Sequence, residues 1–375
     1  MKRINQIALF FFFLYLTSSA VNAQNADCWT SFRGNPQLDG TADVELPESP
    51  KLLWSFKTGD AIKSSPIVCN NTICIGSDDG FVYAISDSGE LKWKFDAETS
   101  IEAPPLYLDN TIYVGSLEGF MYALDAETGE LKWKYLTDGQ ISGSAGWVHS
   151  NDKNSKYIIF GSYDYFLHAV DASSGDSIWK YESDNYINGA PATDGDVAIF
   201  GGCDGNLHLV DVNDGKLIEK IVIGNYVAAS AAMSGEMAFV GDYEGMFYAV
   251  DLKEKDIAWD FDEVGEIVGS PAVSGDKVII GTRDKNVYCF NSSDGTVLWK
   301  FKTLGKIESS PVITNNSVVF GSGDGRIYIL DMNTGKKKWV YEIGSAVDST
   351  PAVTLDLIVV AAKDGRVYAF GMKDE

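Results

Sequence analysis

Short apolar runs alternate with tight polar turns along the chain after its first fifty residues. In the first complete unit, SSPIV is followed by an Asn-Asn turn at 70–71, TICIGS by an Asp-Gly turn at 79–80, FVYAIS by Asp-Ser-Gly at 87–89, and ELKWKF ends the unit. Asn-Asn and Asp-Gly pairs accept the positive φ that tight hairpin turns demand. The pattern predicts four short antiparallel strands per unit, which we call A, B, C and D in chain order.

The unit recurs along the rest of the chain. One series of small residues has steps of 39, 46 and then 40 throughout: Gly76, Gly115, Gly161, Gly201, Gly241, Gly281, Gly321 and Ala361. A second series has matching steps and the same single insertion, with glutamate once in place of tryptophan: Trp54, Trp93, Trp133, Trp179, Glu219, Trp259, Trp299 and Trp339. Two independent series with one spacing indicate a true internal repeat, and the count is eight.

A four-stranded sheet repeated at this period is typical of a propeller blade, because one sheet alone cannot bury both of its faces. We therefore predict an all-β fold, an eight-bladed β-propeller of four-stranded antiparallel blades. Trp54 lies on a D strand before any A strand, and the chain ends after strand C of the last unit. The N-terminal strand should therefore complete the last blade, which would remove two exposed sheet edges.

The first residues have the features of an export signal. Lys2 and Arg3 precede an apolar stretch at 7–20, and Ala23 is a small residue at the expected cleavage position. We predict a signal peptide at 1–23, a leader segment at 24–50 that packs on the propeller, and the propeller itself at 51–375. No later segment approaches the ~20 apolar residues of a membrane span, so we expect no transmembrane segment.

The expected location is therefore the periplasm or cell envelope. Cys28 follows Asn-Ala-Asp rather than the apolar stretch itself, so we expect no lipid anchor. The formal net charge of −23 repels phosphate backbones, which argues against a nucleic-acid partner. Strand pairing around the first turn places Cys69 opposite Thr72, so Cys69 and Cys74 are interpreted as small buried hydrophobic residues.

Positions that stay constant in all eight units should serve the scaffold. An apolar position four before the proline slot of strand A is interpreted as core: Ile62, Ile101, Ile141, Ile187, Val227, Ile267, Ile307 and Val347. A carboxylate three after the repeated glycine is interpreted as a turn residue that accepts local N–H groups, rather than as a metal ligand: Asp79, Glu118, Asp164, Asp204, Glu244, Asp284, Asp324 and Asp364.

Variable positions next to these constant ones are the candidates for binding. The D-to-A connections and the B-to-C turns should lie at the same end of the ring, around the mouth of the central channel. We expect partner contacts from variable residues of these two segments: Lys63, Glu102, Asn188, Glu308, Asp348, Tyr243 and Arg283. A solvated pore is the alternative interpretation, and a carboxylate cluster there could admit Ca²⁺.

The histidines give little catalytic signal. His168 and His208 occupy a slot that is tyrosine in the other units, so we interpret them as aromatic packing residues. His149 lies near Trp147 in the longer third unit, as part of either a partner-binding bulge or an exposed loop. No Ser/His/Asp arrangement stands out, so no catalytic residue and no metal ligand is assigned.

The units GSLEGFMYALDAETGELKWKY and GSGDGRIYILDMNTGKKKWVY resemble the repeat of pyrroloquinoline-quinone (PQQ) enzymes and of BamB-type outer-membrane assembly lipoproteins. The segment CWTSFRGNPQLDG is similar to the one that precedes the first blade in many secreted proteins of this class. The resemblance extends from about residue 28 to residue 371. It implies a structural role for the repeated tryptophans, docked between adjacent blades: Trp54, Trp93, Trp133, Trp179, Trp259, Trp299 and Trp339.

Three functions are compatible with that resemblance. The favoured one is an exported, non-catalytic and monomeric scaffold that binds a protein or peptide in the cell envelope. The alternative is a PQQ-dependent dehydrogenase or PQQ-binding protein with calcium, although many such enzymes hold the quinone with two adjacent cysteines, and this chain has none. A glycan-binding or glycan-processing propeller is the third. The sequence itself implies no cofactor.

Overall fold

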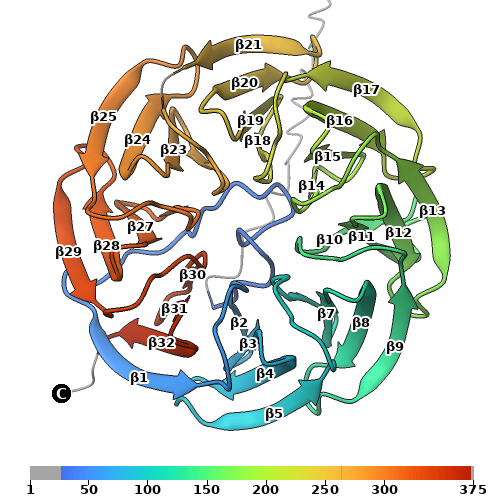
Figure 1. The fold of residues 1–375 in the computed structure, drawn as a ribbon, viewed down its shortest axis with the longest axis horizontal. Coiled ribbons are helices and arrows are strands. Elements are labelled where there is room, and N and C mark those ends of the chain that lie inside the picture. Colours follow the sequence, from blue (N-terminus) through green and yellow to red (C-terminus); the bar gives the residue numbers. More distant parts are fainter. Residues whose placement is uncertain (1–26, 263, 373–375) are drawn as a thin grey trace, which may run out of the picture.

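The computed structural model describes residues 27–262 and 264–372, so the predicted signal peptide at 1–23 lies outside the described residues. Eight four-stranded sheets surround one axis, and every strand pairing is antiparallel (Figure 1). The predicted eight-bladed propeller is confirmed. No helix among the described residues has the length and hydropathy to cross a membrane.

The two inner strands of each blade are short. The A strands are β2 (Ile67–Cys69), β6 (Leu106–Leu108), β10 (Gly146–His149), β14 (Ala192–Thr193), β18 (Ala232–Ser234), β22 (Ala272–Ser274), β26 (Val312–Ile313) and β30 (Ala352–Val353). The B strands are β3 (Thr72–Gly76), β7 (Thr111–Gly115), β11 (Lys156–Gly161), β15 (Val197–Gly201), β19 (Met237–Gly241), β23 (Lys277–Gly281), β27 (Ser317–Ser322) and β31 (Ile358–Ala362).

The outer strands complete each sheet. The C strands are β4 (Phe81–Ser86), β8 (Phe120–Asp125), β12 (Phe166–Asp171), β16 (Asn206–Asp211), β20 (Phe247–Asp251), β24 (Asn286–Asn291), β28 (Arg326–Asp331) and β32 (Arg366–Gly371). The D strands are β5 (Leu91–Asp96), β9 (Leu131–Leu136), β13 (Ser177–Glu182), β17 (Leu217–Val222), β21 (Asp256–Phe261), β25 (Val297–Lys302), β29 (Lys337–Glu342) and, in the eighth blade, β1 (Lys51–Lys57).

The ring closes where the two ends of the propeller meet. Strand β1 pairs with β32 in a sheet of order β1-β32-β31-β30, from Lys51 opposite Gly371 to Lys57 opposite Arg366. Figure 1 shows the blue β1 on the outer edge of the red last blade. The N-terminal strand therefore completes the last blade, as the phase of the repeat predicts.

The core lies between neighbouring blades and explains the repeated glycine. A Cβ at Gly76 would lie 2.2 Å from Ile101 of the next blade, and a Cβ at Gly321 would lie 2.4 Å from Val347. These apolar residues are fully buried. A larger residue at the glycine slot would push the blades apart, because protein interiors leave no free space of that size.

The tryptophans lie at the junctions between blades. The indole N–H of Trp299 donates to the Met332 carbonyl of the next blade at 3.0 Å, and the ring covers Gly335. A Cβ at Gly335, where φ is +66°, would lie 2.6 Å from the ring. The same bond and glycine contact recur at Trp54, Trp93, Trp133, Trp179 and Trp259.

The junction between the fourth and fifth blades is different. Glu219 replaces the tryptophan, and Lys255 replaces the glycine that would face it. The two side chains are 3.9 Å apart and both are about two-fifths exposed. An exposed ion pair of this kind contributes only about 0–1 kcal/mol to stability. This junction therefore has only a weak contact where six of the others have an indole ring packed between the blades.

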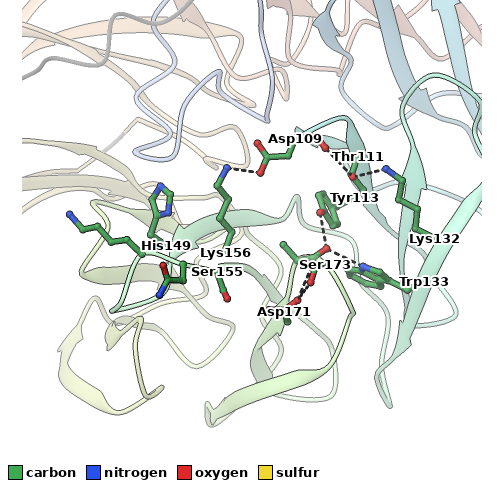
Figure 2. A pocket seen from close by; sticks show the side chains of 13 residues that line it. Asp109, Thr111, Tyr113, Lys132, Trp133, His149, Ser155, Lys156, Asp171 and Ser173 are labelled. Atoms are coloured by element: carbon green, nitrogen blue, oxygen red, sulfur yellow. Dashed lines mark hydrogen bonds and ion pairs between the residues drawn. The ribbon is translucent and has the colours of Figure 1, made fainter.

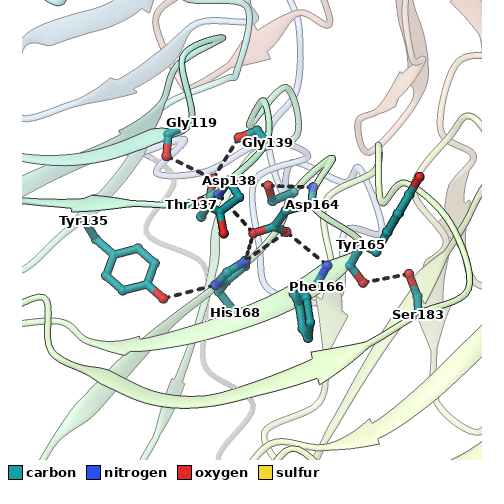
Figure 3. Close-up of polar contacts among 11 residues, drawn as sticks. Gly119, Tyr135, Thr137, Asp138, Gly139, Asp164, Tyr165, Phe166, His168 and Ser183 are labelled. Carbon is teal, nitrogen blue, oxygen red and sulfur yellow. Dashed lines mark hydrogen bonds and ion pairs between the residues drawn. The ribbon is translucent and has the colours of Figure 1, made fainter.

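The constant carboxylate position has two structural tasks. Asp164 accepts the Phe166 N–H at 3.1 Å, as expected for a turn residue, and it also contacts the fully buried imidazole of His168 at 3.0 Å (Figure 3). The other imidazole nitrogen lies 3.2 Å from the Tyr135 hydroxyl of the preceding blade. His168 stacks on Phe160 with a ring-centroid distance of 5.3 Å, which confirms its interpretation as an aromatic packing residue.

The leader segment before the first blade, called the N-terminal segment below, crosses one end of the ring (Figure 1). Its main chain forms hydrogen bonds to the ends of six A strands, at Val68, Tyr107, Thr193, Met233, Val273 and Ile313. Arg33 is fully buried there, and its guanidinium donates to the carbonyls of Pro271 and Pro311 at 2.7 and 2.6 Å. Burial lowers the pKa of Arg33 to about 9.

One prediction about the cysteines is wrong. Cys69 lies opposite Thr72 as expected, but it forms a disulfide with Cys28 instead of being a free buried residue. Strand pairing around the turn excluded only a Cys69–Cys74 bond. Cys28 reaches Cys69 because Trp29 forms a bridge with Val68, which carries the start of the leader segment along strand β2. Cys74 is free and buried.

Candidate binding site at the channel mouth

The D-to-A connections and the B-to-C turns lie together at one end of the ring. In every blade, the N–H two residues after the repeated glycine donates to a carbonyl of the connection that leads into the same blade, as from Asp78 to Ala61 and from Arg283 to Glu266. The N-terminal segment binds the opposite ends of the A strands. This end, which we call the channel mouth, is therefore the uncovered one.

A cavity of about 240 Å³ lies on the axis, with Phe32 of the N-terminal segment among its lining residues. Serine and threonine hydroxyls form a belt in its wall, in which each one accepts an N–H from the preceding blade. The bonds run from Ala190 to Ser230, Ser270, Ser310, Thr350 and Ser65 at 2.8–3.4 Å. Small polar residues therefore hold the innermost strands together and leave the axis open.

Charged residues occupy one side of the mouth. Lys63 contacts Glu102 at 2.5 Å and Asp78 at 3.3 Å. Within the last blade, Lys363 contacts Asp348 at 2.6 Å. These pairs bring three of the predicted residues together with Asp78 and Lys363 in the neighbouring B-to-C turns.

Arg283 is the centre of a second charged group. Its guanidinium contacts Glu308 at 2.6 Å and Glu266 at 2.9 Å, and it donates to the Tyr243 hydroxyl at 2.6 Å. The hydrogen bond that Arg283 donates to Glu266 raises the pKa of Arg283 further above its usual value. Lys306 also contacts Glu308 at 2.6 Å, so this carboxylate is neutralised from two sides.

The pKa values of Glu308 and Asp348 are shifted in opposite directions. Burial alone would raise the pKa of Glu308, but hydrogen bonds from Lys306, Asp348 and Arg283 lower it. Burial, together with the charge of Glu308, raises the pKa of Asp348, although Lys363 opposes this. The pair thus favours a charged Glu308 beside an Asp348 that takes up a proton more readily than an ordinary aspartate.

The other side of the mouth is aromatic. Five side chains, which we call the tyrosine arc, follow the third to the fifth blade: Tyr163, Tyr165, Tyr186, Tyr226 and Tyr243. Tyr163 and Tyr186 stack at a ring-centroid distance of 4.9 Å, and Tyr226 and Tyr243 lie 5.6 Å apart. The side chains of Tyr165, Tyr186 and Tyr226 are 42%, 41% and 36% exposed.

Asn188 belongs to the aromatic side of the site. Its amide nitrogen donates to the Tyr226 hydroxyl and to the Cys203 sulfur, at 2.5 and 3.3 Å. Its amide oxygen is buried and has no hydrogen-bond partner among the residues that the structure describes. The sequence patterns selected Asn188 and Tyr243 but not Tyr165, Tyr186 or Tyr226, which lie at other positions of the same turns and connections.

The site does not offer the ligands that a calcium–PQQ centre would need. Within the described ranges, no three His, Cys, Asp or Glu side chains gather closely enough to hold a metal ion. The carboxylates of Glu102 and Glu308 already contact Lys63 and Arg283. The three free cysteines lie apart in the sequence, at 74, 203 and 289.

Several solved structures share the fold of this chain. BamB from Moraxella catarrhalis is similar with a TM-score of 0.73 and 20% identity, over 87% of this chain and 98% of that one. Quinohemoprotein alcohol dehydrogenase from Comamonas testosteroni has a TM-score of 0.80 and 13% identity, over 94% and 82% of the two chains. A europium-containing methanol dehydrogenase has a TM-score of 0.77 and 14% identity, over 93% and 99%. These likenesses show the fold alone.

The family follows from the sequence. The family model described as outer membrane protein assembly factor BamB matches residues 44–261 and 243–374, which together span most of the chain. The chain belongs to this family. No curated protein sequence matches this chain.

Proposed function

We propose that this protein is an exported scaffold that binds a protein or peptide partner of the cell envelope at the channel mouth. The observation that carries the proposal is the tyrosine arc, three members of which are more than one-third exposed. Tyrosine and arginine are enriched at interface positions that contribute most to binding, because they offer large apolar surfaces with a polar end.

The charged side of the mouth would orient the partner. Its carboxylates and cations are held in fixed pairs, such as Lys63–Glu102 and Arg283–Glu308. Fixed charges at the rim of an interface favour one orientation of the partner and speed its approach more than they add affinity. The unpaired amide oxygen of Asn188, beside Tyr226, is an acceptor that a partner N–H would satisfy.

The disulfide supports export. Disulfides form and persist in oxidising compartments such as the periplasm, and Cys28 is bonded to Cys69. A sulfur in this bond is not available for a thioether to lipid, so the proposal is a protein that is not anchored through Cys28. Membership of the BamB family favours a partner from outer-membrane protein assembly.

Site-specific photo-crosslinking tests this proposal. A photoreactive residue at 186 or at 226 should give adducts in intact cells, whereas one at Leu131, an equally exposed position on the outer strand β9, should not. Mass spectrometry would identify the partner. Adducts that form equally at all three positions, or at none, would contradict the site.

Substitution separates the two sides of the mouth. Tyr165→Ala combined with Tyr186→Ala should weaken partner capture at least tenfold, because two exposed rings are lost. Glu102→Gln, Glu308→Gln and Asp348→Asn together should slow association and reduce its salt dependence. Leu91→Ala with Leu131→Ala is the matched control on the outer strands and should leave capture unchanged. Full capture by both mouth variants would remove the assignment.

A further inference from the structure

The face opposite the channel mouth carries a cavity of about 460 Å³ at the junction of the second and third blades. Blade 2 contributes Asp109, Thr111 and Lys132, and blade 3 contributes His149, the loop 153–155 and Lys156 (Figure 2). The loop belongs to the only unit with 46-residue spacing, so the insertion builds one wall of the cavity. A volume of this size suits a compact ligand.

Comparison among the blades shows that the cavity has an unusual charge. The carbonyl of Lys156 accepts the Ala172 N–H, just as the carbonyl of Asp196 accepts the Val212 N–H one blade later, so the two positions are structurally equivalent. In the seven other blades this position is an amide or a carboxylate: Asn71, Asn110, Asp196, Glu236, Asp276, Asn316 and Asp356. Blade 3 alone carries a cation there.

The basic residues of the cavity differ in how many hydrogen-bond and ion-pair partners they have. Lys132 donates to the Asn110 carbonyl and to the Thr111 hydroxyl, both at 3.0 Å. Lys156 contacts Asp109 at 2.5 Å and lies over the Trp147 ring. In the part of the chain that the structure describes, neither the ammonium of Lys153 nor the ring nitrogens of His149 have a hydrogen-bond or ion-pair partner.

The acidic groups of the cavity are already engaged. Asp171 accepts the N–H groups of Ser173 and Ser174 and the Ser173 hydroxyl, at 2.5–3.0 Å. Asp109 is paired with Lys156. Lys132 contacts Asp125 at 3.1 Å, so among the described residues Lys153 is the one lysine of the cavity lining without an acidic partner, in a chain whose net charge is −23.

From this geometry we propose that the cavity binds a compact ligand through a carboxylate, held by Lys153 and Lys156. Long polyanions are excluded by the negative charge of the rest of the molecule. Thr111, Asn154 and Ser155 line the same cavity and offer hydrogen bonds to hydroxyl or amide groups of the ligand. Acidic sugars and short acidic peptides both provide such a carboxylate.

Calorimetric titration of the full chain distinguishes the two sources. One pair of probes is digalacturonic acid and its neutral dimethyl ester; the other is acetyl-Asp-Asp-amide and acetyl-Asn-Asn-amide. We expect the acid of at least one pair to bind and its neutral partner to bind at least tenfold more weakly. The pair that responds identifies the source, and absence of binding by both acids would overturn the proposal.

Substitutions test the residues. Lys156→Asn introduces the side chain that three other blades carry at this position. Lys153→Ala changes a residue of a surface loop. Both variants should therefore fold with an unchanged melting temperature. Each should weaken binding of the responding acid at least tenfold. Lys216→Ala is the control, because Lys216 is a paired and exposed lysine of a C-to-D turn in the next blade. Equal affinity in all variants would contradict the site.

Discussion

At the scale of single residues, comparison among the repeats separated constant positions from variable ones. It predicted that the constant carboxylates are turn residues and that His168 replaces a tyrosine. It could not predict that Tyr135 of the preceding blade completes the contacts of His168, since that bond joins two blades. It also missed the Cys28–Cys69 bond, because Cys28 precedes the repeats and has no equivalent in any blade.

Asp164 should make stability depend on acid pH. Burial would raise the pKa of this carboxyl, but the hydrogen bond and charge of His168, with backbone N–H groups, lower it to about 2. Because the folded pKa lies below the ordinary value of about 3.9, the contribution of the carboxylate is complete above that value and is lost as pH falls toward the folded pKa.

Urea unfolding of the wild type and of Asp164→Asn between pH 6 and pH 2.5 measures this contribution. The wild type should be more stable than the variant at pH 5–6, and the difference should shrink below about pH 4. Asp204→Asn should behave in the same way, since His208 lowers the pKa of Asp204 to about 2 in the next blade. A difference that persists unchanged to pH 2.5 would show that the carboxylate charge is not what stabilises the pair.

At the scale of elements, the strands were predictable because their signals are local. Alternation of apolar residues and the turn chemistry of Asp-Gly and Asn-Asn define each hairpin within a dozen residues. The leader segment has no repeat and no alternation, so its path across the ends of six A strands required the structure. The tyrosine arc was missed for a related reason, since its members come from separate turns and connections that only the ring brings together.

The blade junctions allow a matched test. Trp299→Ala should lower the free energy of unfolding by about 3–5 kcal/mol, because it leaves a cavity above Gly335 and removes an indole hydrogen bond. Glu219→Ala at the equivalent position should change it by less than about 0.5 kcal/mol, since its ion pair is exposed. Urea denaturation measures both, and similar losses in the two variants would mean that the tryptophans do not hold the blades together.

At the scale of the whole molecule, the phase of the repeat was enough to predict how the ring closes. The Trp54 strand precedes the first A strand and the last unit lacks a D strand, so the pairing of β1 with β32 follows from counting. The location of the candidate site at the mouth follows from the same alternation of strands. The division of the site into a charged and an aromatic side could not be predicted in this way, because it depends on side-chain contacts between blades.

The Cys28–Cys69 bond should stabilise the whole ring. It closes a loop with a sequence separation of 41 residues, and the chain-entropy model assigns about 4 kcal/mol to a loop of this length. Cys28→Ser with Cys69→Ser should therefore unfold at clearly lower urea concentration than the wild type. Reduction of the wild type with dithiothreitol should reproduce the shift. Cys74→Ala is the control, because it removes a thiol and leaves the bond intact.

The pairing of β1 with β32 also determines when the eighth blade can form. Among the described residues, strand β1 has its one sheet partner in β32, so the eighth blade cannot assemble until the last strand has been synthesised. A product that stops short of Arg366 keeps an unpaired strand edge, which proteases and aggregation partners recognise. A truncated chain would therefore differ from the complete one by an exposed edge in its own last sheet.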